Sequence, residues 1–298
     1  MEEASRSLPE GLGELEIPGI ALFRRGKVRD TFDLGDRLLM VSTDRVSAFD
    51  VVLPTLIPDR GRVLTAMSRY WFAKTSGLVP NHLLPDDPTV LPEGTWERLD
   101  GRAMLVARAD RIDVECVVRG RLAGSGWQEY LATGKLAGEP LPPGLSFGDE
   151  LPELRFTPAL KKDHGHDENI SRAQLTRLVG GELAGQLEEF SYRIFRLAQV
   201  HCRESGFVLV DTKFEFGFIE GVLTLIDELL TPDSSRLWEL SVEVGSDSYG
   251  FDKQLVRDYL TRSGWDRNPP APALPDELVR ETRRRYLEAC RRITDSEL

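Results

Sequence analysis

One segment of the chain alternates charged and apolar side chains in a way that could support phosphate chemistry. The run LVDTKFEFG, residues 209–217, places Asp211, Lys213 and Glu215 at every second position. Successive side chains of a β-strand point to opposite faces, so these three share one face and the residues between them share the other. Such a charged face borders a functional site or carries ion pairs in water, and the spacing alone favours neither interpretation.

A second carboxylate follows on the next apolar run, residues 222–226, which ends at Asp227. A carboxylate buried there without a partner would be costly. Glu215 and Asp227 are 12 positions apart, and a three-residue loop or one bulge would place them opposite each other on one face. A two-residue loop would instead pair Asp227 with Phe214, on the wrong face. We expect the first register, in which both carboxylates hold Mg²⁺ together with phosphate oxygens.

The turn after this run gathers Asp233, Ser234 and Arg236. Asp and Ser often cap helices, so one interpretation is a plain helix start at residues 233–235. The other is a cluster of carboxylate, hydroxyl and guanidinium groups beside the proposed metal. Such a cluster could bind a ligand that carries both an ammonium and a carboxylate group, such as an amino acid.

A glycine-rich loop, residues 119–126, follows a predicted strand and precedes a predicted helix. The N–H groups at the start of such a helix, with Arg119 and Ser125, could hold a phosphate or a carboxylate. The loop matches neither the Walker A pattern nor GxGxxG, and glycines also occur simply where a turn is tight.

Other polar residues give weaker signals. Lys27 and Arg29 would point the same way from a hairpin strand, which suits either a lid over a polyphosphate or an exposed basic edge. His164 and His166 have no third nitrogen or sulfur ligand nearby, so we favour a polar substrate loop over a transition-metal site. No histidine stands beside a serine or cysteine in the way that a hydrolase triad requires.

Strands dominate the first part of the chain and helices the second. We expect a hairpin over residues 27–42 and an extended segment over 46–56, followed by strands over 104–108 and 112–119. Ser171 and Gln174 fit a capping box, and Asp252 is suited to cap a further helix. Residues 140–158 are rich in proline and glycine and are expected to form a loop. Helices are predicted over residues 65–75, 127–133, 182–204 and 276–293.

Composition sets the broad class. The 298 residues include 38 Lys and Arg against 49 Asp and Glu, a net charge of −11, with 41% apolar residues. This is the composition of a globular protein of about two lobes, and it argues against a nucleic-acid coat. No window is apolar enough to span a bilayer and no export signal is visible, so we expect a cytoplasmic protein with three reduced cysteines. We place the lobe boundary near Arg119, giving lobes of residues 1–118 and 119–298.

Several of these segments resemble the phosphoribosylaminoimidazole-succinocarboxamide synthase (SAICAR synthetase) family. The similar motifs occur in order over roughly residues 20–260. One departure is Asp113, which stands where the family commonly has proline. The motifs are GKVRD at 26–30, STDRVSAFD at 42–50, VECVVRGRLAGS at 114–125, HDENIS at 166–171 and LVDTKFEFG at 209–217.

The resemblance implies an ATP-dependent ligase of purine biosynthesis. ATP would phosphorylate the carboxylate of carboxyaminoimidazole ribonucleotide, and the amine of L-aspartate would displace the phosphate. The implied fold is a two-lobed α+β protein similar to kinases and ATP-grasp enzymes. It would have a small antiparallel β lobe, a larger α+β lobe and the nucleotide in the cleft. The implied cofactors are ATP and Mg²⁺.

The resemblance also assigns roles by position. Glu215 and Asp227 correspond to metal ligands, and Lys213, with Asp211, to catalytic positions. Nucleotide binding is assigned to Lys27, Arg29, Glu115 and Lys161. Substrate binding is assigned to Arg119, Ser125, Asp233, Ser234, Arg236 and Lys253. Asp44 and Arg45 match family positions without a defined role.

Two other functions are compatible with parts of the pattern. A different Mg·ATP phosphotransferase on the same scaffold would keep the metal ligands and change the acceptor. A non-catalytic nucleotide-binding module would be expected to lack a metal carboxylate or Lys213, and the chain has them all. We expect a monomer or small homo-oligomer that acts on small molecules, without a nucleic-acid or membrane partner.

Overall fold

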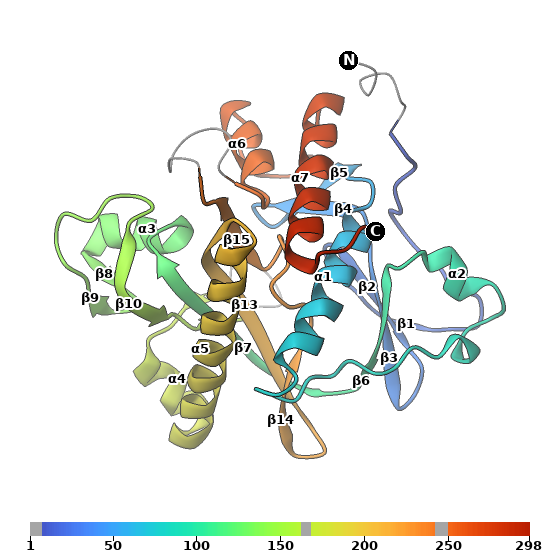
Figure 1. Ribbon diagram of the computed structural model, residues 1–298, viewed down its shortest axis with the longest axis horizontal. Coiled ribbons are helices and arrows are strands. Elements are labelled where there is room, and N and C mark those ends of the chain that lie inside the picture. The colour runs from blue at the N-terminus through green and yellow to red at the C-terminus, as the bar shows by residue number, and fades with distance from the viewer. Residues whose placement is uncertain (1–7, 162–167, 242–249) are drawn as a thin grey trace. The chain divides into compact units, whose positions relative to one another are not determined.

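The computed structural model of the protein describes residues 8–161, 168–241 and 250–298 (Figure 1). The chain forms two compact units. The first contains Met1–Ala66, Leu83–Ala107 and Lys253–Leu298, and the second contains Met67–His82 and Arg108–Asp252. The chain therefore alternates between the two units, and residues 253–298 belong to the first unit.

The first unit is built around an antiparallel sheet with strand order β1-β2-β3-β6 among the described residues. A separate hairpin, β4–β5, turns at Phe49 and Asp50, which both have positive φ. Two such residues form the tight turn that suits the twist of a hairpin. The strands are β1 Leu22–Arg25, β2 Arg29–Asp33, β3 Arg37–Ser42, β4 Arg45–Ala48, β5 Val51–Leu56 and β6 Ala103–Ala107.

Helices from both ends of the chain complete the first unit. The long final helix was predicted from the sequence. Its residue Val279 belongs to a buried apolar cluster with Val256, Leu260 and Leu274. This cluster packs against Ile57 and the β4–β5 hairpin. Helix α1 begins in this unit and ends in the second. The helices are α1 Arg60–Thr75, a 3₁₀ turn at Pro88–Val90, α2 Thr95–Leu99, α6 Gln254–Arg262 and α7 Asp276–Thr294.

The second unit contains a larger antiparallel sheet, of seven strands among the described residues. Its central path is β12-β11-β7-β13-β14, with β10 paired to β7 and β15 paired to β13. A small hairpin, β8–β9, stands apart. The strands are β7 Asp110–Arg121, β8 Lys135–Leu136, β9 Glu139–Pro140, β10 Glu150–Phe156, β11 Ala159–Leu160, β12 Glu168–Asn169, β13 Phe207–Ile219, β14 Val222–Ile226 and β15 Ser235–Glu239.

Helix α5, Gly181–Glu204, packs on β13 and β7 (Figure 1). Its buried stripe includes Leu187, Ile194 and Phe195, which lie at helical spacing. The shorter α4, Arg172–Val179, begins with the predicted capping box, in which the Ser171 and Gln174 side chains bond each other's backbone N–H. Helix α3, Gly124–Thr133, follows β7 as expected. The α+β class predicted from the sequence is confirmed.

Several local predictions were wrong. The segment 46–56, expected to be extended, forms the β4–β5 hairpin with its turn at Phe49 and Asp50. The segment 140–158, expected to be a loop, contains β10, and Arg155 and Phe156 of that strand pair with β7. Pro152 lies where the register of β10 is irregular, which is a position that tolerates proline in a strand. Helix α6 begins at Gln254 with Lys253 at its N-cap, rather than with Asp252.

No helix in the described part of the chain is long and apolar enough to cross a membrane. The three cysteines, Cys116, Cys202 and Cys290, are free and buried in the described structure. Burial raises the pKa of each thiol, that of Cys202 to about 12, so little thiolate forms at neutral pH.

We therefore expect the cysteines to be unreactive in the folded protein. Titration with a chromogenic disulfide at pH 8 should label fewer than about 0.1 thiol per chain within minutes, because thiolate is the attacking species. The same titration in denaturant should label all three residues. Rapid labelling of one thiol without denaturant would show that a cysteine is exposed in solution.

Candidate active site

Strand β13 carries the alternation predicted from the sequence. Phe214 and Phe216 are fully buried on one side, and the register pairs Asp211, Lys213 and Glu215 with Arg119, Val117 and Glu115 of β7. The charged residues therefore share the sheet face opposite to the aromatic side chains. The prediction of one apolar and one charged face is confirmed.

Lys213 is the centre of an ionic cluster on this charged face. Its Nζ donates to Oε1 of Glu115 at 2.7 Å and to Oε1 of Glu215 at 3.3 Å. Lys161, which follows β11, donates to Oε2 of Glu215 at 2.6 Å. Strand pairing explains the assembly, because Glu115 pairs with Glu215 on β13 and with Ala159 on β11. Four residues assigned separately from the sequence thus form one cluster.

The electrostatics of the cluster fix the charge of Lys213. Burial by itself would lower the pKa of Lys213, but the carboxylates of Glu215, Glu115 and Asp227 outweigh it and raise the pKa well above its usual value. Lys213 is therefore protonated throughout the neutral pH range. It can act as a fixed positive charge, and it cannot act as a general base.

The predicted hairpin register was wrong. Ile219 pairs with Val222 and Glu215 pairs with Ile226, so the loop consists of the two residues Glu220 and Gly221. Both have positive φ, 50° and 78°, as this tight turn requires. This is the register that would put Asp227 on the aromatic face if the strand continued.

The strand does not continue to Asp227, so the face of this side chain is not set by the strand. β14 ends at Ile226, and Asp227 has a left-handed backbone with φ 67°. Alternation applies only to extended residues, so it does not govern the direction of this side chain. The Asp227 carboxylate lies close enough to Lys213 to raise the pKa of that amine. Asp227 therefore acts on Lys213 through its charge, and the register predicted to place it opposite Glu215 is not the one observed.

The carboxylates of this cluster are donors of the kind that Mg²⁺ prefers. In the described residues, no group of three or more His, Cys, Asp or Glu side chains is arranged to hold a metal by itself. A metal ion at Glu215 and Asp227 would therefore need further ligands from a bound molecule. Lys161 and Lys213 supply positive charge next to them, which favours an anionic ligand.

A second ionic cluster lies further along β13, around Asp211. Its Oδ2 accepts from Nη1 of Arg119 at 3.0 Å and also from Nη1 of Arg236. The Arg119 guanidinium also donates to Oγ1 of Thr157 and to Oγ of Ser125, both at 3.0 Å. Arg119 is 4% exposed, and its guanidinium is hydrogen-bonded to three side chains. The structure therefore unites Arg119, Ser125 and Arg236, and Thr157 is a partner that the sequence analysis missed.

The turn between β14 and β15 is organised by Thr231 and does not start a helix. Oγ1 of Thr231 accepts the N–H groups of Asp233 and Ser234, both at 3.2 Å, and donates to Glu228 at 2.6 Å. The helix-cap interpretation of residues 233–235 was therefore wrong, because β15 begins at Ser235. Thr231 was missed as well, although a Thr-Pro-Asp-Ser sequence is typical of a turn that a threonine hydroxyl closes.

In the first unit, Lys27 and Arg29 have different surroundings. Lys27 lies in the loop between β1 and β2, is half exposed and forms an ion pair with Asp50. Arg29 starts β2 and is 9% exposed, with its Nε 3.4 Å from Oγ of Ser42. Strand alternation therefore does not apply to this pair, since Lys27 is not in a strand.

Arg45 holds this loop in place. Its guanidinium donates to the backbone oxygens of Gly13, Gly26 and Lys27 at 2.7, 3.1 and 3.2 Å. It also forms two bonds to the fully buried carboxylate of Asp30, at 2.6 and 3.3 Å. The role of Arg45, undefined from the sequence, is to fix the Lys27 loop.

We expect replacement of Arg45 by Met to lower the free energy of unfolding by about 3 kcal/mol or more, because it breaks a buried ion pair. Chemical denaturation would measure the loss. The control is Arg37→Met, which removes a partly exposed arginine paired with Asp36 and Asp87 and should cost at most about 1 kcal/mol. Equal losses in the two variants would contradict a structural role for Arg45.

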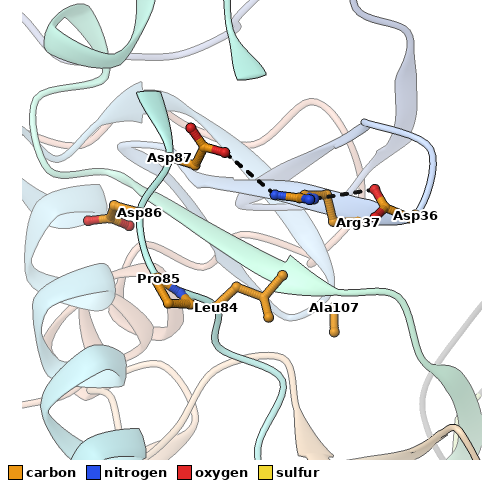
Figure 2. A pocket seen from close by; sticks show the side chains of 7 residues that line it. All are labelled: Asp36, Arg37, Leu84, Pro85, Asp86, Asp87 and Ala107. Atoms are coloured by element: carbon orange, nitrogen blue, oxygen red, sulfur yellow. Dashed lines mark hydrogen bonds and ion pairs between the residues drawn. The ribbon is translucent and has the colours of Figure 1, made fainter. Parts of the chain in front are cut away.

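The remaining predicted residues are less informative. Lys253 lies at the N-cap of α6 and is part of the first unit. His164 and His166 lie outside the described residues. A surface pocket in the first unit is lined by Asp36, Arg37, Asp86 and Asp87, with Leu84, Pro85 and Ala107 (Figure 2). None of the predicted site residues lines it.

Comparisons with known proteins agree with this fold and these clusters. The profile of the SAICAR synthetase family matches residues 22–272. The phosphoribosylaminoimidazole-succinocarboxamide synthases of Syntrophobacter fumaroxidans and Thermodesulfovibrio yellowstonii are both 48% identical to the chain. The alignments cover 96% and 94% of it, and 97% and 98% of those proteins. The solved SAICAR synthase of Saccharomyces cerevisiae, complexed with SAICAR, is 38% identical, with a TM-score of 0.87 over 96% of this chain and 99% of that chain.

These similarities place the protein in the class of ATP-dependent ligases. The chain belongs to the SAICAR synthetase family, whose members act in purine biosynthesis. The resemblance predicted from the sequence motifs is confirmed.

Proposed function

We propose that this enzyme joins L-aspartate to carboxyaminoimidazole ribonucleotide in three chemical events. An oxygen of the imidazole carboxylate attacks the γ-phosphorus of ATP, which releases ADP and leaves an acyl phosphate. The amine of aspartate then attacks the acyl carbon. The C–N bond forms, the C–O bond to phosphate breaks, and phosphate and the amine proton leave.

The observation that supports this proposal is the pair of ionic clusters on one face of the second unit's sheet. Lys213 and Asp211 are two residues apart on β13, which corresponds to roughly 7 Å along a strand. The Arg119–Asp211–Arg236 cluster can hold an anionic substrate while the Lys213 cluster contacts the phosphoryl group that is transferred. Catalysis of this type depends mainly on position and charge.

In this mechanism Lys213 stabilises negative charge on the phosphoryl group during transfer. Its positive charge is fixed by its carboxylate neighbours, so it requires no proton transfer. Glu215 and Asp227 would hold Mg²⁺, which would neutralise part of the charge of the phosphate groups when bound. Lys161 and Glu115 lie at the same cluster and would contact the nucleotide. Lys27 and Arg29 of the first unit are proposed to contact the nucleotide phosphates.

Substrate binding is proposed for the Asp211 cluster and the Thr231 turn. Arg119, Ser125 and Arg236 would bind the ribonucleotide, and Asp211 would hold the two guanidinium groups between them. Asp233 and Ser234 would bind polar groups of the substrates. Lys253 is proposed to reach the ribonucleotide phosphate. The buried, unbridged cysteines are compatible with the proposed cytoplasmic location.

The test of the reaction is an omission assay. Purified enzyme with Mg²⁺ should release ADP over many turnovers when ATP, L-aspartate and the ribonucleotide are all present. Omission of aspartate or of the ribonucleotide should each reduce the turnover rate at least about 100-fold, because the acyl phosphate is then not formed or not consumed. Steady ADP release without the ribonucleotide would favour a phosphotransferase with another acceptor.

The proposed substrate site has its own prediction. We expect Arg119→Ala to raise the KM for the ribonucleotide about 100-fold and the KM for ATP less than about threefold, because a buried charge-assisted contact is lost. Initial rates with each substrate varied in turn would measure both constants, and thermal unfolding would show that the variant folds. Equal changes in the two constants would move Arg119 out of the substrate site.

A further inference from the structure

Gly124 lies where the backbone passes very close to a guanidinium group. It is the first residue of α3 and has a left-handed backbone, with φ 54°. A Cβ atom at this position would lie 2.2 Å from Nη2, 2.5 Å from Cζ and 2.7 Å from Nη1 of Arg236. Real Cβ atoms do not approach other atoms this closely. The Arg236 guanidinium therefore occupies space that any side chain at position 124 would need.

This close approach is linked to the ion pairs of the Asp211 cluster. The Arg236 guanidinium that lies against Gly124 donates to Asp211, and it shares that carboxylate with Arg119. The next residue of the helix, Ser125, bonds to Arg119. The first turn of α3, which carries Gly124 and Ser125, thus lies against the Arg236 side chain of β15. A displaced Arg236 would leave Asp211 paired with Arg119 alone.

We propose that Gly124 is a positioning residue that sets the distance between Arg119 and Arg236 for binding one anionic group. The proposal rests on the proposed function, in which these two arginines bind the ribonucleotide. Two guanidinium groups anchored to one carboxylate are held before the ligand arrives, so little order is lost on binding. A shift of about 1 Å in one of them weakens recognition of a phosphate or carboxylate strongly.

The collision should displace Arg236 without unfolding the protein. The atoms that a Cβ would meet are the far end of a flexible side chain, and not backbone. The substitution Gly124→Ala therefore combines ordinary left-handed backbone strain with a local shift of the guanidinium. Gly134 provides a matched control at the other end of the same helix. It also has a left-handed backbone, with φ 68°, and a Cβ there would meet no atom within 4 Å.

The experiment compares Gly124→Ala with Gly134→Ala in kinetics and in direct binding of the ribonucleotide and of ATP by calorimetry. We expect Gly124→Ala to raise the KM and Kd of the ribonucleotide about 30- to 100-fold, with the ATP constants within about twofold. Gly134→Ala should leave all of these constants near those of the original enzyme. Equal effects of the two variants, or equal loss of ATP and ribonucleotide binding, would overturn the inference.

A double-variant cycle tests whether the effect acts through Arg236. In an Arg236→Ala background no guanidinium remains to collide, so Gly124→Ala should add less than about twofold. If Gly124→Ala fails to fold, the Gly124→Ala/Arg236→Ala variant should fold, and its failure would overturn the inference. An effect of Gly124→Ala that persists in full beside Arg236→Ala would overturn it as well.

Different results would disprove the proposed function and the inference about Gly124. If Arg236→Ala alone leaves ribonucleotide binding unchanged, the assignment of Arg236 to the substrate site is wrong, and the inference about Gly124 is wrong with it. If Arg236→Ala weakens binding and Gly124→Ala does not, the substrate site stands and Gly124 has no positioning role.

Discussion

We expect replacement of Lys213 by Met to lower kcat about 10³-fold or more, because it removes the fixed positive charge at the transferred phosphoryl group. Methionine keeps much of the length of the side chain but cannot neutralise Glu115 or Glu215, with which Lys213 is paired. The Kd of the ribonucleotide should change less than about threefold, since Arg119 and Arg236 are unchanged. Rapid-quench measurement of ADP formation and calorimetry would measure the two effects.

The matched control is Lys135→Met, which removes an exposed lysine of the same unit and should retain full activity. Thermal unfolding of both variants separates loss of fold from loss of charge. More than a tenth of the original kcat in Lys213→Met would contradict the catalytic assignment.

The raised pKa of Lys213 also predicts a pH dependence. Glu215, Glu115 and Asp227 keep the amine protonated well above its usual pKa, in spite of burial. Its ion pairs therefore stabilise the folded protein at neutral pH, and this contribution is lost only as the pH rises through the folded-state pKa. In the metal-free protein we therefore expect the contribution of Lys213 to the free energy of unfolding to stay constant between about pH 7 and pH 10. A decrease of the free energy of unfolding in that range that disappears in Lys213→Arg would contradict this conclusion.

Strand periodicity was sufficient to predict one half of the site. Asp211, Lys213 and Glu215 lie in a long, regular strand, where side-chain direction follows from position alone. The sequence could not indicate that Asp211 and Lys213 belong to different clusters. That depends on which residues β7 and β15 bring opposite them, Glu115 in one case and Arg119 with Arg236 in the other.

Asp227 belongs to the half of the site that strand periodicity could not predict. Counting positions predicts side-chain direction only where both residues lie in regular strands, and a three-residue loop or a bulge would then be required to bring the carboxylates together. The loop has two residues, and the backbone of Asp227 leaves the extended region, so strand parity does not fix the direction of its side chain. A left-handed aspartate at a strand end has no periodic signature, although Asp tolerates this conformation better than most residues.

Local sequence signals also could not indicate which segments of the chain make up each unit. Helix α7 was predicted with nearly correct bounds, because its amphipathic period is strong. Its partners are Val46 and Leu53 in the first 60 residues, and periodicity identifies an apolar face without identifying what covers it. The strand β10 was missed because Pro152 and the surrounding glycines were taken as signs of a loop.

We expect Asp227→Asn to abolish turnover, with kcat reduced about 10³-fold, while the protein remains folded. Asparagine adopts the left-handed backbone of this position as readily as aspartate does, so the substitution removes charge without strain. A neutral amide is a weaker ligand for Mg²⁺ than a carboxylate. The Kd of Mg·ATP should rise at least about tenfold, and the Kd of the ribonucleotide should stay within about twofold because the Asp211 cluster is unchanged.

Electron paramagnetic resonance of Mn²⁺ with a non-hydrolysable ATP analogue would report metal binding independently of turnover. The matched control is Asp110→Asn, the same change at an exposed position of β7 in the same sheet, and it should leave metal binding and activity unchanged. Near-normal activity in Asp227→Asn would rule out a metal-ligand role for this carboxylate. Lost activity with normal Mn²⁺ binding would instead show that Asp227 acts by orienting Lys213, whose pKa it raises.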